Sequence, residues 1–283
     1  GYSGTYVENA GAIYDAGATV TDSDTTVLNG GQLIYQVIAN GTATDELGIR
    51  NQGTGAGQIG LSGTNVTYGG TTIGTYSGSF GTGSTPLTVT FNSNASVAAV
   101  QALVRNITYR NTSENPSTAT RSISLTVSDG TGMTSTPAVV TMAVSAVNDA
   151  PVITSAATAN VAENATAVMT VSSSDVDGGT PAYTLSGGLD QARFAINSST
   201  GALSFSTAPD YEAPTDSGAD NVYDVTVQVS DGAGGTASQA IAVTVTPLRD
   251  NPPIITSSAT VSVAENNTAV ITITASDADQ PAN

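Results

Sequence analysis

Three short acidic motifs recur along the second half of the chain at a fixed interval. A linker, a Glu-Asn pair and an Asp-x-Asp pair occur first as Val147-Asn148-Asp149-Ala150-Pro151, Glu163-Asn164 and Asp175-Val176-Asp177, and again as Asp250-Asn251-Pro252-Pro253, Glu265-Asn266 and Asp277-Ala278-Asp279. Each second copy lies 102 residues after the first, as Glu163 and Glu265 illustrate. A constant offset across three motifs marks a tandem repeat.

The chemistry of these motifs is restricted to oxygen ligands. Carboxylate and amide oxygens without nitrogen or sulfur suit a hard cation, and Ca²⁺ takes about six to eight such ligands. A lone Asp-x-Asp is usually a turn in which Asp caps its own backbone, but repetition in register favours a metal site. The chain has no His, Cys or Lys to act as base or nucleophile. Since catalytic carboxylate pairs are not normally copied into every repeat, we do not expect this chain to be an enzyme.

Composition limits the class of protein further. The 283 residues suffice for two domains and part of a third. The net charge of −17 disfavours nucleic acid and anionic membrane surfaces as partners. No apolar run approaches the length of a membrane span, and the absence of Cys excludes a disulfide scaffold. No signal peptide is visible, and we expect this chain to be part of a longer protein.

The sequence pattern of residues 1–147 predicts an all-β module with one short helix. Glu8-Asn9 and Asp22-Ser23-Asp24 open it, and apolar residues recur between Gly53 and Ser84, Phe80 among them, which indicates hairpins with tight turns. A strand is expected at 87–91, and further strands near 107–109, 123–127 and 140–144. Asn94 or Ser96 can cap a helix whose apolar face carries Val97, Val100, Leu103 and Val104.

Residues 148–251 have the rhythm of a small β-sandwich, with strands expected at 168–171, 182–185, 194–196, 203–205, 223–229 and 241–245. Ser198 to Gly201 predicts a hairpin turn. Along 223–229, Val225, Val227 and Val229 alternate with polar residues and are expected to face inward. Residues 252–283 repeat only the opening two strands of such a module and cannot close a core by themselves.

The second module resembles a cadherin repeat. The resemblance rests on six motifs in the same order over about one hundred residues: Glu163-Asn164, Asp175-Val176-Asp177, Phe194 to Leu203, Asp210-Tyr211-Glu212, Val229-Ser230-Asp231 and Asp250-Asn251-Pro252-Pro253. The low Lys content and the Val-Asn-Asp-Ala-Pro linker look like the cadherin-like repeats of large bacterial surface adhesins. The resemblance implies tandem Greek-key β-sandwich modules of cadherin or immunoglobulin type in an extended rod.

The resemblance also implies Ca²⁺ at the junctions between repeats, with ligands from both sides. At the first junction these are Glu8, Asn148 and Asp149 from below and Asp175, Asp177 and Asp231 from above. At the second they are Glu163, Asp210, Glu212, Asp250 and Asn251, with Asp277 and Asp279 above. Asp22, Asp24 and Asp129 would face a preceding repeat, and Glu265 is the corresponding Glu of the third. The first module lacks Asp-x-Glu, for which Glu114 is a substitute. Val147 and Arg249 stand where animal cadherins have Asn, so we expect fewer cations per junction than in animal cadherins.

These features predict a calcium-stiffened structural or adhesive segment of a bacterial extracellular or cell-surface protein. Its partners would be other repeats, neighbouring subunits, a surface polysaccharide or another cell. One alternative is a filament subunit completed by strands of a neighbour. Another is a carbohydrate-binding module of a secreted protein, because seven of ten tyrosines, Tyr2 and Tyr14 among them, lie in the first 110 residues.

Overall fold

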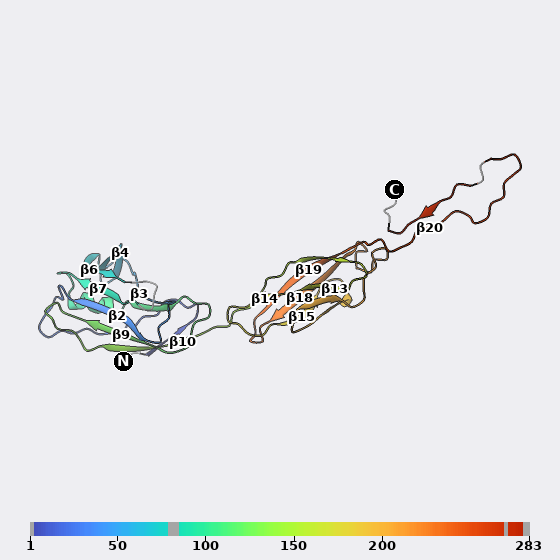
Figure 1. Ribbon diagram of the computed structural model, residues 1–283. Coiled ribbons are helices and arrows are strands. Elements are labelled where there is room, and N and C mark those ends of the chain that lie inside the picture. Colours follow the sequence, from blue (N-terminus) through green and yellow to red (C-terminus); the bar gives the residue numbers. More distant parts are fainter. Residues whose placement is uncertain (1–2, 79–84, 269–270, 280–283) are drawn as a thin grey trace. The chain divides into compact units, whose positions relative to one another are not determined.

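The computed structural model describes residues 3–78, 85–268 and 271–279, and it divides into two compact units, Gly1–Val147 and Asn148–Asn283 (Figure 1). Tyr2 and Phe80 lie outside the described residues. Both units are built from β-strands, so the predicted all-β class is confirmed. No helix in the described part of the chain is long and apolar enough to cross a bilayer.

The larger layer of the first unit is an eight-stranded sheet with the order β1-β10-β9-β2-β7-β6-β5-β4. Its strands are β1 (Ser3–Val7), β2 (Gln32–Ala39), β4 (Ile59–Ser62), β5 (Asn65–Tyr68), β6 (Thr71–Ser77), β7 (Leu87–Phe91), β9 (Arg121–Val127) and β10 (Ala138–Ser145). Only β1 and β10 pair in parallel among these strands. The hairpins expected between Gly53 and Ser84 form as the antiparallel pairs β4–β5 and β5–β6, within the part of that range that is described, which ends at residue 78.

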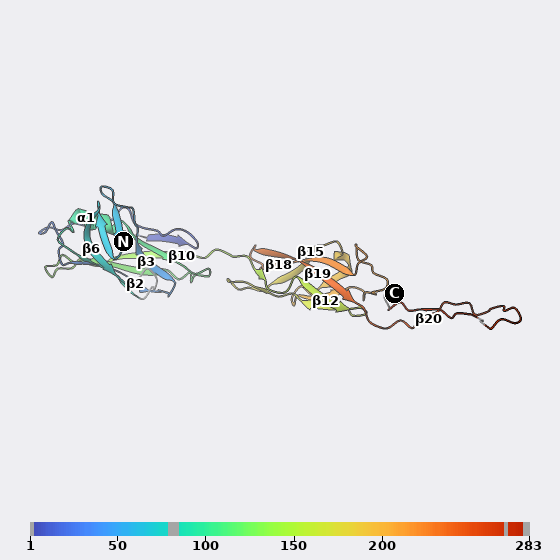
Figure 2. The same cartoon turned by 90° about the horizontal axis from the view of Figure 1, so that it is seen from above.

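The second layer of this unit is a two-stranded sheet and the helix. β3 (Asp45–Ile49) pairs antiparallel with β8 (Ile107–Asn111), and α1 spans Val97–Val104 (Figure 2). Ser96, not Asn94, caps α1, because its hydroxyl accepts the Ala99 N–H at 3.2 Å. The apolar side chains of α1, β3 and β8 join those of the large sheet in one core.

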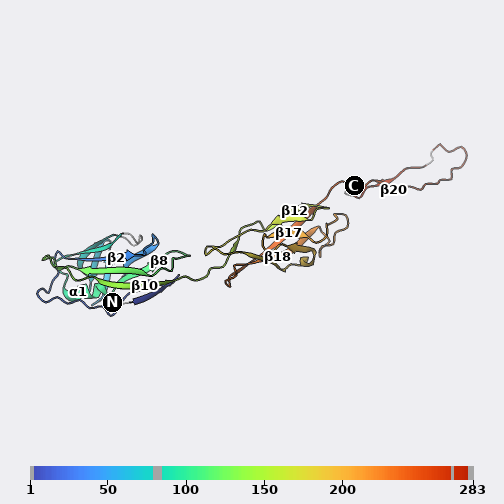
Figure 3. The same ribbon diagram turned by 60° about the horizontal axis from the view of Figure 1, so that its bottom comes forward.

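The second unit contains a sandwich of two sheets, of which strands β12, β17 and β18 are labelled in Figure 3. One sheet has the order β12-β19-β18-β15 and the other β13-β17-β16, while β11 pairs with β14. The strands are β11 (Val152–Ile153), β12 (Thr158–Ala162), β13 (Ala167–Thr170), β14 (Ser173–Ser174), β15 (Ala182–Gly187), β16 (Phe194–Ile196), β17 (Ala202–Phe205), β18 (Val222–Ser230) and β19 (Thr236–Thr246), with a 3-10 turn at Gln191–Arg193.

Alternation decides which residues of β18 enter the core. Val225, Val227 and Val229 are buried, while the residues between them are not, as predicted. The sheets meet through aromatic rings, since Phe194 stacks on Phe205 with centroids 4.6 Å apart. Between β16 and β17, Gly201 adopts φ 70° and closes the predicted turn by donating its N–H to the Asn197 carbonyl.

The third stretch differs from the expectation of two opening strands. Among its described residues only β20 (Ile254–Ile255) and β21 (Ala275–Ser276) are strands, and they pair with each other (Figure 1). Residues 260–264, the counterpart of β12, are described and do not form a strand. In the second unit β12 pairs with β19, which lies far along the chain, so local sequence alone does not make this segment a strand.

Candidate metal centres

The Glu-Asn motif folds in the same way in each unit. Glu8 and Glu163 are buried, and each carboxylate accepts a backbone N–H at or just before the next linker. The Val147 N–H donates to Glu8 at 2.7 Å, and the Leu248 N–H donates to Glu163 at 2.6 Å. Asn9, Asn164 and Asn266 all adopt positive φ, which Asn tolerates better than most residues. The motif therefore fixes a carboxylate at the end of the sandwich.

Around Glu163 the second unit gathers a dense group of carboxylates. Oxygen atoms of Glu163, Asp210 and Glu212 lie within 4.8 Å of one another, and so do those of Glu212, Asp250 and Asp279. Glu212 belongs to both groups. Desolvation, and then the neighbouring charges of Glu163, Asp279 and Asp210, raise the pKa of Glu212. These groups repel one another when ionised.

Asn251 is the amide at the centre of this group. Its side-chain amide donates to Glu212 at 3.2 Å, to Asp250 at 3.0 Å and to Asp279 at 2.9 Å. Its backbone N–H also donates to Asp279 at 2.9 Å. Ion pairs in the described residues join Arg110 to Glu46 and Arg121 to Asp45, and none reaches this group. Among the described residues, the Asn251 amide therefore supplies hydrogen-bond donors to these carboxylates, and no Arg side chain forms an ion pair with them.

The linker of the first repeat boundary is held to the loops of the second unit. The Asp149 N–H donates to Asp177 at 2.6 Å, the Asp177 N–H donates to Asp175 at 2.9 Å, and the Asn148 amide donates to Asp231 at 2.7 Å. The pKa of Asp231 is lowered, first by the Asn148 amide and then, against desolvation, by backbone N–H groups of residues 233–235.

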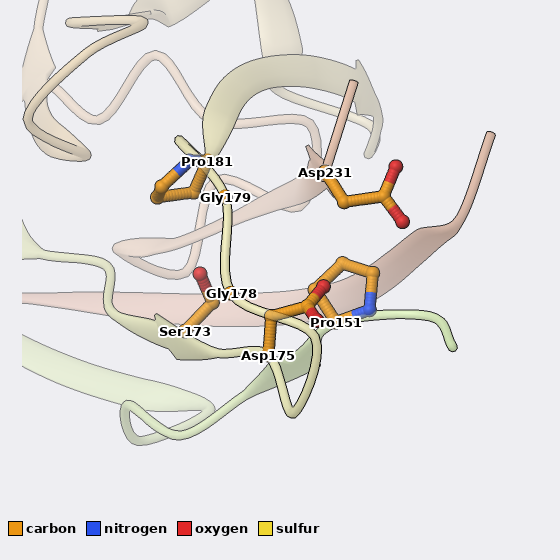
Figure 4. Close-up of a pocket in the computed structure, with 7 residues that line it drawn as sticks. All are labelled: Pro151, Ser173, Asp175, Gly178, Gly179, Pro181 and Asp231. Atoms are coloured by element: carbon orange, nitrogen blue, oxygen red, sulfur yellow. The ribbon is translucent and has the colours of Figure 1, made fainter. Parts of the chain in front are cut away.

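Asp175 has an oxygen without a partner. Its Oδ2 atom is buried and accepts no hydrogen bond from any described residue. Asp175 and Asp231 line one small cavity of about 130 Å³ beside Pro151 and Gly179 (Figure 4). A buried carboxylate oxygen is costly unless it binds a donor or a cation.

A third group lies in the first unit, where carboxylate oxygens of Asp22, Asp24 and Asp129 are within 4.8 Å of one another. Asp22 and Asp129 are satisfied by nearby N–H and hydroxyl donors, which lower both pKa values. The pKa of Asp24 is raised by its side-chain contact with Asp22 and by the charge of Asp22. The three line a cleft of about 330 Å³.

Glu114, the substitute ligand, also lies beside the Glu8-Asn9 motif. A carboxylate oxygen of Glu114 is within 4.8 Å of one of Glu8, and Glu114 accepts a hydrogen bond from the Asn9 amide at 3.1 Å. Asp277 accepts the N–H of Asp279 at 3.1 Å, as Asp175 does for Asp177. Glu265 is exposed and lies in none of the carboxylate groups found among the described residues.

Sequence reasoning missed three buried carboxylates away from these groups. Asp45 bonds Arg121, Tyr109 and Asn111 inside the first unit, while Asp190 and Asp216 accept backbone N–H groups in the second. A signal was available for Asp45, because it shares the inward-facing alternation of Leu47 and Ile49.

The chain is similar in fold to several solved structures. Mouse cadherin-23 EC22–24 is 17% identical with a TM-score of 0.48, covering 99% of this chain and 75% of that one. Human CDH23 EC21–23 is 19% identical with a TM-score of 0.46, covering 99% and 78%. Human protocadherin-24 EC1–2 is 22% identical with a TM-score of 0.41, covering 48% and 62%.

No curated protein matches the chain. The model of the family described as Bacterial Ig domain matches residues 148–244. That segment covers the linker and both sheets of the sandwich in the second unit. The family match and the two-sheet sandwich confirm the predicted immunoglobulin-like module for residues 148–244.

Proposed function

We propose that this chain is a calcium-binding structural or adhesive segment of a bacterial extracellular protein, in which Ca²⁺ fixes the end of one repeat to the start of the next. The proposal rests on the cluster of five carboxylates formed by Glu163, Asp210, Glu212, Asp250 and Asp279. Its donors are all oxygen, and the described residues place no Arg against it. Such a set fits Ca²⁺.

The physical role of the cation follows from the repulsion. Without it, three segments that carry like charges, 210–212, 250–251 and 277–279, are held by the Asn251 amide. A divalent cation would neutralise the carboxylates and tie the segments together. Oxygen ligands at the first linker, including the unpartnered Asp175 Oδ2 atom, support the same role there. Affinity on the order of 10⁻⁴ to 10⁻³ M suffices outside cells.

Calorimetry of the whole chain in Ca²⁺, Mg²⁺ and chelator tests the proposal. At ten times the dissociation constant, one bound cation should stabilise the folded state by about 1.4 kcal/mol. Glu212→Gln should weaken Ca²⁺ binding, because Glu212 belongs to both carboxylate groups. Asp224→Asn is the matched control, since Asp224 is exposed on β18 outside these groups. Equal binding by both variants, or no calcium effect on melting, would overturn the proposal.

A second candidate, self-assembly through added strands, is favoured by one observation. Apolar side chains of the third stretch are exposed, namely Ile254, Ile255, Val261, Val263, Ile271 and Ile273. An exposed apolar surface of this kind is typical of an interaction site, and strands of a neighbouring subunit would bury it. Sedimentation over a hundredfold concentration range tests this candidate, and a constant monomer mass would exclude it.

The tyrosines give little support to a flat sugar-binding face. Tyr6, Tyr35 and Tyr109 are buried, and Tyr6 packs edge-on against Tyr109 with centroids 5.7 Å apart. These three side chains belong to the core of the first unit.

A further inference from the structure

The outer face of the small β3–β8 sheet carries an arginine-lined cleft of about 390 Å³. Strand alternation builds it. Alternation along β3 directs the side chains of Asp45, Leu47 and Ile49 into the core. Glu46 and Gly48 therefore belong to the opposite face and line the cleft together with Arg50, just beyond the strand. Ligand pockets commonly have volumes of about 300–1,000 Å³, so the cleft can receive one small ring.

Small residues leave the middle of this face open. In the register of the sheet, Gly48 lies opposite Thr108, and Glu46 lies opposite Arg110. Ile13 bridges to Tyr109 on the other edge of β8, with both backbone N–H bonds at 3.0 Å. Ala12 and Tyr14, which flank Ile13, line the same cleft. The floor therefore consists of Ala12, Gly48 and Thr108, with larger side chains around it.

Two of the six arginines in this acidic chain meet at the cleft. The Arg50 guanidinium stacks over the Tyr14 ring, with its carbon 4.5 Å from the centroid. Stacking uses the flat face of the guanidinium and leaves its in-plane N–H groups available. No carboxylate in the described part of the chain forms an ion pair with Arg50. Arg50 therefore presents a charged donor edge to a ligand.

Arg110 and Glu46 set the charge of the cleft. Glu46 accepts a hydrogen bond from the Arg110 Nε atom, so the terminal nitrogens of Arg110 are not used in this pair. Two guanidinium groups and one carboxylate leave a net charge of one positive unit. This balance suits a ligand with a single negative charge better than a phosphate dianion.

The strands beneath the cleft are held rigidly from the inside. On the buried face, Asp45 accepts hydrogen bonds from Tyr109 and Asn111, each at 2.6 Å, and pairs with Arg121. Tyr109 and Asn111 are on β8 and Asp45 is on β3, so the network joins the two strands. A recognition surface gains affinity when its backbone is fixed before binding.

We propose that this cleft binds a carboxylate-bearing sugar of an acidic polysaccharide. Arg50 and Arg110 would take the carboxylate through paired N–H donors. Glu46 and Thr108 would bond the ring hydroxyls, the former as an acceptor. The methyl group of Ala12 would contact the ring. This cleft is separate from the acidic clusters proposed to bind Ca²⁺, and ligand binding in it does not depend on Ca²⁺.

Titration of the whole chain with trigalacturonate in chelator tests this assignment, with the fully methyl-esterified trimer as the neutral probe. We expect a dissociation constant on the order of 1 mM or below for the acid and no binding of the ester. Arg50→Gln should weaken binding about tenfold, since it removes hydrogen bonds to a charged group. Arg193→Gln, which removes an exposed arginine of the second unit, should have no effect.

Further measurements distinguish sugar binding from the binding of other anions and from a folding defect in the variants. Arg110→Gln serves as a second variant, and the melting temperature of each variant shows that it folds. Equal binding of the ester, equal binding by Arg50→Gln and wild type, or tighter binding of inorganic phosphate or triglutamate would each overturn the proposal. Binding that appears only with Ca²⁺ would place the sugar on the carboxylate groups instead and would equally overturn it.

Discussion

The buried Asp45 of the first unit and the carboxylate group around Glu212 in the second handle negative charge in opposite ways. Asp45 is fully buried, and the chain supplies its partners: Arg121, Tyr109 and Asn111. Although burial raises the pKa of Asp45, hydrogen bonds led by Tyr109 outweigh it and the net pKa is lowered. The carboxylate is therefore stable in its ionised form.

The Glu212 group has five carboxylates but only amide and backbone donors among the described residues. Here the net pKa of Glu212 is raised. The two sites differ in their source of positive charge: Asp45 has Arg121, whereas no ion pair among the described residues reaches the Glu212 group.

The largest effect should follow from Arg121→Met. This change leaves Asp45 buried without its cation, and breaking a buried pair by removing one partner costs about 3–5 kcal/mol. Chemical denaturation of the first unit, followed by hydrogen exchange, measures the loss. The double variant Asp45→Asn, Arg121→Met should recover part of it, because no uncompensated charge remains. A double variant less stable than Arg121→Met would contradict this account.

Acid should affect the two regions in opposite directions. The pKa values of Asp45 and Asp216 are lowered in the folded state, the latter because backbone N–H bonds from Asp220 and Asn221 outweigh burial. Their stabilisation is present above the ordinary value of 3.8 and is lost as the pH falls through the lower folded pKa values.

For Glu212 the sign is reversed. A raised folded pKa means that ionisation destabilises, so the cost disappears as the pH falls toward the ordinary value of 4.5. In chelator, the hydrogen-exchange protection factors of residues 210–212 should rise slightly between pH 7 and 5. The surroundings of Asp45 and of Asp216 should lose protection only below about pH 4. Loss of both regions together near pH 6 would contradict this prediction.

Sequence accounts for features set by local pattern. Alternation along 223–229 predicted the buried face of β18, because the side-chain period of a strand is two. Apolar spacing and a capping hydroxyl predicted α1. Motif repetition brought the acidic residues to attention, and most of them lie in the carboxylate groups or bond to the linkers.

What sequence could not supply was the distinction between a satisfied and a crowded carboxylate. Asp22 and Asp24 belong to one motif, yet the pKa of one is lowered and that of the other raised. That difference depends on which N–H groups point at each oxygen. The Asp45–Arg121 pair joins residues on two different sheets, a contact that no local pattern encodes.

A smaller effect should follow from Asn251→Asp, which replaces the donor at the centre of the Glu212 group by another carboxylate. In chelator, hydrogen exchange of residues 250–251 should speed up, because three hydrogen bonds are lost and repulsion rises. In Ca²⁺ the affinity should increase about threefold or more, since affinity follows the charge of the ligand set. Titration calorimetry compares the variant with wild type. Weaker calcium binding would show that Asn251 is itself a required ligand.

The smallest effect should come from Asp24→Asn in the first unit. Asp24 is exposed, and its contact with Asp22 raises its pKa, so removing its charge relieves repulsion without emptying a buried position. In chelator the melting temperature should stay the same or rise slightly. In Ca²⁺ the variant should gain less stability than wild type, because an oxygen ligand has lost its charge. Calorimetry at both conditions resolves the two effects. If Asp24→Asn responds to Ca²⁺ as wild type does, the carboxylates of Asp22, Asp24 and Asp129 only cap turns, and this cluster does not bind the cation.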